Sequence, residues 1–65
     1  MNLDVLLHHD VLVEFVDGGG MKGHVDAHIS AEDNDPDPES IVLICRKAHY
    51  EIGIDEIKKV TILDN

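Results

Sequence analysis

Apolar and polar residues alternate along most of this chain with the two-residue period of a β-strand. The clearest stretch runs from Met21 to Ser30, where small or apolar residues take every second position. The positions between them hold Lys22, His24, Asp26, His28 and Ser30. A strand with this period buries one face and keeps the other in water. The pattern therefore predicts a strand with one solvated face, on which His24, Asp26 and His28 lie together.

A second strand is predicted just before the first. The segment from Val11 to Asp17 is rich in β-branched and aromatic residues, which favour strands, and it places Val11, Val13 and Phe15 on one face. The following Gly18-Gly19-Gly20 supplies residues that adopt positive φ without steric cost. We therefore expect the two strands to close as an antiparallel hairpin. Neither a Gly-Lys-Ser/Thr sequence nor a helix start follows the glycines, which argues against a phosphate-binding loop.

Three more strands are predicted in the second half of the chain. The segment from Ile41 to Arg46 is an almost unbroken apolar run, which is typical of a strand covered on both faces. Alternation returns from Ala48 to Ile54, and the inward positions are Tyr50, Ile52 and Ile54. A last short strand is predicted from Lys59 to Leu63. The predicted connections are a tight turn at Arg46-Lys47-Ala48 and one helical turn at Asp55-Glu56-Ile57, capped by Asp55.

The two remaining segments complete the expected fold. Leu3, Leu6 and Leu7 have helical spacing, so a helix of about two turns is predicted within residues 2–9, with Asn2 as its cap. Residues 31–40 hold five acids and two prolines without apolar periodicity, which predicts an extended surface loop or a disordered insertion. We therefore predict a mainly β fold: a small, five-stranded, strongly bent antiparallel barrel with a short N-terminal helix, forming one domain over residues 1–65.

Two segments resemble the motifs of the Sm-like (LSm) small β-barrel family. The residues that resemble the first motif are Val11, Val13, Phe15, Asp17, Gly18, Gly23 and Val25. Those that resemble the second are Ile52, Gly53, Ile54, Asp55, Glu56, Ile57 and Val60. SH3-like barrels share a similar rhythm of glycines and β-branched residues. The resemblance implies subunits that pair through their edge strands into closed rings, here through Tyr50, Ile52, Ile54, Val60 and Ile62.

The chain departs from the RNA-binding pattern of that family. The positions at which RNA-binding members carry an aspartate and an asparagine hold Ile29 and Asp33, and Gly53-Ile54 stands where Arg-Gly is usual. Fourteen acidic against five basic residues give a net charge of -9, which repels nucleic acid and anionic membranes alike. RNA binding is therefore disfavoured. A positive rim built from Arg46, Lys47, Lys58 and Lys59 is the feature that could restore it.

Length and cysteine content bear on assembly and location. At 65 residues, folding hides only about 60% of the surface that the unfolded chain exposes, so association between copies is expected. The single cysteine cannot form an internal disulfide, and neither a secretory leader pattern nor a long apolar run is present. We therefore expect a cytoplasmic protein that does not enter membranes.

The sequence gives little support for a metal-binding site. Along one strand His24 and His28 stand about 13 Å apart, too far to share a metal ion. A metal would need an acid from a neighbouring strand or subunit. The acidic run from Asp33 to Glu39 lacks the glycine and the terminal glutamate of a calcium-binding loop. His8-His9 is expected at a helix C-terminus, where histidine interacts favourably with the helix dipole.

The sequence also gives little support for a catalytic site. Cys45 is expected to be a small buried apolar residue, although His49 follows it across the turn and could contact it. We find no catalytic triad order or zinc-protease motif. We therefore expect a non-enzymatic protein without a cofactor, which forms a homo-oligomeric ring and acts in assembly or in binding a protein partner. The alternative is an RNA-binding regulator that uses the basic rim.

Overall fold

The structure is a computed structural model, and it describes residues 2–64. It forms one sheet of five antiparallel strands, in the order β4-β3-β2-β1-β5. The strands are β1 (Asp10–Phe15), β2 (Gly20–Ile29), β3 (Ser40–Cys45), β4 (Ala48–Gly53) and β5 (Ile57–Ile62). The helical elements are η1 (Leu3–Leu6), α1 (Ala31–Asn34) and η2 (Ile54–Glu56). The predicted mainly β class, the five strands and the N-terminal helical element are confirmed, and the strand ends differ by one or two residues.

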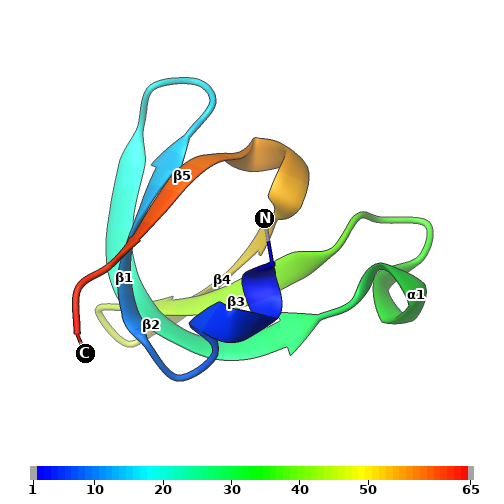
Figure 1. The fold of residues 1–65 in the computed structure, drawn as a ribbon, viewed down its shortest axis with the longest axis horizontal. Helices are drawn as coiled ribbons and strands as arrows, with labels where there is room; N and C mark the ends of the chain where they lie inside the picture. The colour runs from blue at the N-terminus through cyan, green and yellow to red at the C-terminus, as the bar shows by residue number, and fades with distance from the viewer. Residues whose placement is uncertain (1, 65) are drawn as a thin grey trace.

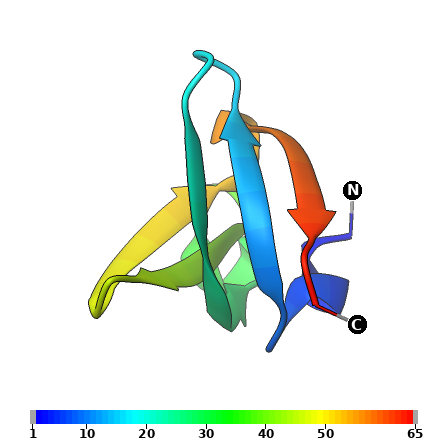
Figure 2. The same cartoon turned by 90° about the vertical axis from the view of Figure 1, so that its left-hand side faces the viewer.

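The sheet is strongly curled but does not close into a barrel (Figures 1 and 2). β3 pairs with β4 and β1 pairs with β5, whereas no ladder joins β4 to β5 across the residues described. The right-handed twist that accumulates from strand to strand coils the sheet without bringing its two edges into register. Closure of the barrel was therefore predicted wrongly, while the prediction that β4 and β5 form the edges is confirmed.

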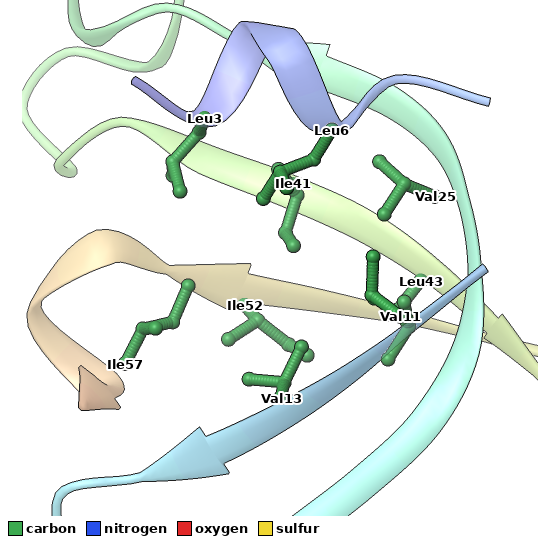
Figure 3. Packing of buried hydrophobic residues seen from close by; sticks show 9 residues of the cluster. All are labelled: Leu3, Leu6, Val11, Val13, Val25, Ile41, Leu43, Ile52 and Ile57. Carbon is green, nitrogen blue, oxygen red and sulfur yellow. The ribbon is translucent and has the colours of Figure 1, made fainter. Parts of the chain in front are cut away.

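The core occupies the concave side of this sheet (Figure 3). Its members are Leu3, Leu6, Val11, Val13, Val25, Ile41, Leu43, Ile52 and Ile57. The predicted inward face of β1 is confirmed, because Val11 and Val13 are fully buried and Phe15 packs against the core. On β3 the convex-side residues Val42 and Ile44 are only half-buried. The prediction that this strand is covered on both faces was therefore wrong.

The N-terminal helical element is shorter than predicted. It is a four-residue 3-10 helix, and the side chain of Asn2 makes no capping hydrogen bond. The chain leaves the helix because residues 8 and 9 pair with β2: the His8 N–H donates to the Val25 carbonyl, and the Val25 N–H donates to the His9 carbonyl. His8 reaches this position with φ of 69°. Backbone pairing with the sheet thus replaces the second helical turn.

The acidic segment after β2 begins with a helical turn, so it is not extended throughout. Ser30 caps α1 by accepting a hydrogen bond from the Asp33 N–H. The amide of Asn34 then donates to the Pro38 carbonyl at 2.7 Å and to the Glu51 carboxylate at 3.1 Å. Ser40, which is buried, donates to the same carboxylate at 3.1 Å. The segment is therefore fastened to β4 at its C-terminal end.

Candidate functional site

A β-bulge in β2 separates the polar residues that the alternation placed on one face. His24 pairs with Ile44 and Val25 with Leu43, but the next pair is Ala27 with Val42, so Asp26 has no partner in β3. One extra residue reverses the alternation of the side chains that follow. His28 pairs with the buried Ile41 and therefore lies on the concave side, whereas His24 lies on the convex side. The predicted shared face was wrong for this reason.

Three of the histidines instead pair with carboxylates from other parts of the chain. His24 Nδ1 lies 2.8 Å from Asp10 Oδ1, and His9 Nδ1 lies 3.0 Å from Asp64 Oδ1. The most buried pair joins His28 Nε2 to Glu39 Oε2 at 2.5 Å. The hydrogen bond from His9 lowers the pKa of the exposed Asp64 carboxyl below its ordinary 3.8. Thus His9 contacts Asp64 and does not serve the helix-end role that was predicted for the His8-His9 pair.

These pairs do not assemble into a metal centre. Among residues 2–64, no group of three or more histidine, cysteine, aspartate or glutamate side chains is arranged to hold an ion. Cys45 is half-buried and free, and it pairs with Ala48, whereas His49 pairs with Ile44. Neighbouring residues of a strand point to opposite faces, so Cys45 and His49 lie on opposite sides of the sheet. The contact considered from the sequence is therefore absent.

Within one copy, the four candidate nucleic-acid-binding residues lie in two separate places. Arg46 and Lys47 form the turn between β3 and β4, while Lys58 and Lys59 are the second and third residues of β5, which follows η2. Figure 1 shows these two places at opposite ends of β4. A six-residue strand is about 20 Å long. Within one copy the two basic pairs are therefore separated by the length of β4, and the positive rim of an assembled ring stays a prediction.

The turn between β3 and β4 has a strained backbone. Arg46 and Lys47 both have positive φ, 51° and 70°, in a two-residue connection between paired strands. This is the geometry of a type I′ turn, for which Asn-Gly is the favoured sequence. A side chain with a Cβ costs on the order of 1 kcal/mol at each such position. The chain thus holds two cationic side chains where smaller residues would be more stable.

An open groove of about 770 Å³ lies beside this turn. Lys22 and His24 of β2, Arg46 of the turn, and Tyr50 of β4 contribute to its lining. Asp10 also lines it and accepts the hydrogen bond of His24 described above. The groove therefore gathers cationic groups and the only tyrosine of an acidic chain. The sequence analysis missed it because Lys22 and Arg46 are distant in the chain and are brought together only by the pairing of β2 with β3.

The two edge strands carry free backbone hydrogen-bonding groups. In a two-residue hairpin the residues next to the turn exchange both hydrogen bonds, so Ala48, Tyr50 and Ile52 bond to β3. His49 and Glu51 therefore point their N–H and C=O groups away from the sheet. On β5 the Leu63 N–H donates to the Asp10 carbonyl, so the backbone groups of Leu63 point toward β1. The backbone groups of successive residues point alternately toward β1 and away from it.

The alternation on β5 has the same consequence. Because Leu63 bonds toward β1, Val60 and Ile62 direct their N–H and C=O groups away from β1, to the side of β5 that has no neighbouring strand. Gly53 is the next outward-pointing residue of β4, and its N–H is already satisfied by the Glu56 carboxylate at 2.9 Å. Each edge strand thus offers two consecutive outward-pointing residues to another strand.

The residues predicted to line these edges differ in exposure. Ile52 is buried in the core of its own chain, and Ile54 and Val60 pack against that core. Tyr50 pairs with the buried Leu43 and so lies on the inward face, as predicted. Its side chain is nevertheless 43% exposed, as is that of Ile62. Leu63, directly after β5, is half-exposed. Tyr50 and Ile62 are therefore the predicted edge residues that are free to contact another molecule.

Comparisons with known protein families, curated proteins and solved structures find no match to this chain. Among residues 2–64, no helix has the length and apolar character needed to cross a membrane.

Proposed function

We propose that this protein is a non-enzymatic assembly module that joins copies of itself through β4 and β5 into a closed ring, in the manner of Sm-like proteins. The observation that carries this proposal is the pair of unpaired sheet edges, each with two outward-pointing residues. An edge strand with free N–H and C=O groups is a template for adding another strand. The ring then offers a repeated surface for a protein partner.

Charge favours joining β4 of one copy to β5 of the next. The first half of β5 carries Lys58 and Lys59, both exposed, so two copies of β5 side by side would repel each other. β4 carries Glu51, whose carboxylate is held in place by Asn34 and Ser40. Opposite charges on the two edges favour a head-to-tail contact, which produces a ring when the rotation closes.

Apolar side chains at the edges support the same contact. Tyr50 on β4 and Ile62 and Leu63 at the end of β5 are exposed. A chain of this size buries only a small core, so leaving large apolar side chains in water reduces the free energy available for folding. Covering apolar surface contributes about 25 cal/mol per Å². Strand addition across these edges would cover part of all three side chains.

Sedimentation and native mass spectrometry test this proposal. We expect wild-type protein at tens of micromolar to form one species of several times the 7.2 kDa subunit mass. His49→Pro removes an N–H that the β3 ladder does not use, and proline is tolerated on sheet edges. It should yield a folded monomer, with the circular dichroism of the wild type retained.

His49→Ala is the matched control, because it removes the same side chain and keeps the N–H, so it should stay assembled. If His49→Pro does not fold, Ile62→Pro against Ile62→Ala makes the same comparison on β5. A monomeric wild type, or assembly that survives both proline variants in folded form, would overturn the proposal.

A further inference from the structure

The groove beside the β3–β4 turn concentrates positive charge on a strongly acidic protein. Of the five lysines and arginines in the chain, Lys22 and Arg46 line it and Lys47 is the adjacent residue of the turn. Its lining includes one acid, Asp10, and that carboxylate is paired with His24. The charge of the groove is therefore opposite to the net charge of -9 that the whole chain carries.

The ring of His24 is positioned by this pairing. A carboxylate can only accept a hydrogen bond, so His24 Nδ1 donates to Asp10 at 2.8 Å. Across residues 2–64, His24 Nε2 has no hydrogen-bond partner. When the ring is protonated, Nε2 becomes a third cationic donor alongside Lys22 and Arg46. Asp10 thus holds the ring in place as a positioning residue.

The groove also has an apolar part. Tyr50 lines it with a side chain that is 43% exposed, and Leu63, half-exposed, lies at its border. Aromatic side chains offer flat faces on which planar rings stack. The arginine guanidinium is a planar donor fork that matches a phosphate or carboxylate. One region therefore presents an anion-binding set and a stacking surface.

We propose that this groove binds a small aromatic anion, a flat ring that carries a phosphate or a carboxylate. The anionic group contacts Arg46, Lys22 and His24, and the ring lies against Tyr50. The strained turn supports this assignment, because Arg46 and Lys47 keep positive φ at a cost that Asn-Gly would avoid. The inference does not depend on self-assembly, since the groove belongs to a single copy.

The test is a titration of isotope-labelled protein by NMR, with phenyl phosphate and benzoate as separate probes. We expect saturable shifts of the amides of Lys22, His24, Arg46 and Tyr50, with a Kd on the order of 1 mM or tighter. Whichever of the two probes binds more tightly shows whether the groove prefers a phosphate or a carboxylate. Inorganic phosphate, which lacks the ring, and benzyl alcohol, which lacks the charge, should each bind at least about tenfold more weakly.

Two variants locate the site. Arg46→Gln should weaken binding of phenyl phosphate by about tenfold or more, the loss expected for one charge-assisted hydrogen bond. Lys58→Gln is the matched control, because it removes one positive charge at the other end of β4, and it should leave binding unchanged. Tyr50→Leu keeps an apolar side chain and should also weaken binding by about tenfold.

Several outcomes would overturn the inference. One is that neither aromatic probe reaches saturation up to about 10 mM. Another is that Arg46→Gln and Lys58→Gln weaken the binding of phenyl phosphate equally. A third is that inorganic phosphate binds as tightly as phenyl phosphate. An oligonucleotide that binds while both small probes fail would also overturn it and would identify a nucleic-acid surface instead.

Discussion

Gly23 of β2 lies directly against the backbone of Ile44 in β3. A Cβ added to Gly23 would come within 2.5 Å of the Ile44 carbonyl oxygen and 2.8 Å of Leu43 Cγ. Atoms of the peptide backbone cannot move aside as the end of a flexible side chain can. The tight curl of the sheet at this point therefore requires a residue without a side chain, which gives a physical reason for the glycine five positions after Gly18.

Gly23→Ala should destabilise the protein by about 2 kcal/mol, because the added methyl group forces β2 and β3 apart. The measurement is the free energy of unfolding from urea titration, followed by circular dichroism. Gly20→Ala is the control, since its Cβ would lie 3.4 Å from the nearest atom, the Val13 carbonyl oxygen. Equal stabilities of the two variants would contradict the close approach of the strands at Gly23.

The sequence predicted the elements that rest on local chemistry. The glycine-rich turn after Asp17 and the alternation of Val11 and Val13 determine the β1–β2 hairpin within a few residues of chain. The bulge at Asp26 was not predictable in this way. The polar and apolar residues keep alternating through it, although His28 has changed faces, and the change is visible only in the pairing with β3.

The candidate site was less predictable than the fold. The basic residues of the β3–β4 turn were identified from the sequence, but their true neighbours were not. Lys22 approaches Arg46 through the pairing of β2 with β3, and His24 is oriented by Asp10, fourteen residues earlier. Lys58 and Lys59, grouped with Arg46 on charge alone, lie at the far end of β4. Long-range strand register, which composition does not contain, decides which charges meet.

Replacing Arg46-Lys47 by Asn-Gly should stabilise the protein by about 1 to 2 kcal/mol. Both positions have positive φ, which asparagine and glycine adopt at lower cost. Thermal and urea unfolding measure the change. The double variant with glutamine at both positions controls for charge, because it keeps the strained backbone and should show little gain. Equal gains in the two variants would mean that charge repulsion, and not backbone strain, destabilises the turn.

Asn34→Ala should release the acidic segment from β4. The amide of Asn34 donates to Pro38, Ser40 and Glu51 at 2.7, 3.4 and 3.1 Å. Loss of these bonds should cost about 1 to 2 kcal/mol. Limited proteolysis should then cut within residues 31–39 faster than in the wild type. Asp33→Ala is the control, because α1 uses only the backbone N–H of Asp33. Cleavage at equal rates in both variants would contradict the role of the Asn34 amide.

Asp64 should make the stability of the protein depend on pH in the acidic range. Its pKa is lowered from the ordinary 3.8, chiefly by the hydrogen bond from His9. A carboxyl group whose folded pKa lies below the unfolded value stabilises the fold at pH above the unfolded pKa. That contribution is lost as the pH falls below 3.8 and through the lowered pKa of the folded state.

Asp64→Asn should therefore lose less stability than the wild type when unfolding is compared at about pH 5 and about pH 2. Asp4→Asn is the control, because no ion pair joins Asp4 to another group among residues 2–64, and it should follow the wild-type profile. A carboxyl-carbon NMR titration of Asp64 measures the shift directly. An Asp64 midpoint at or above the ordinary value, or identical acid profiles for Asp64→Asn and the wild type, would show that the contact between His9 and Asp64 contributes nothing in solution.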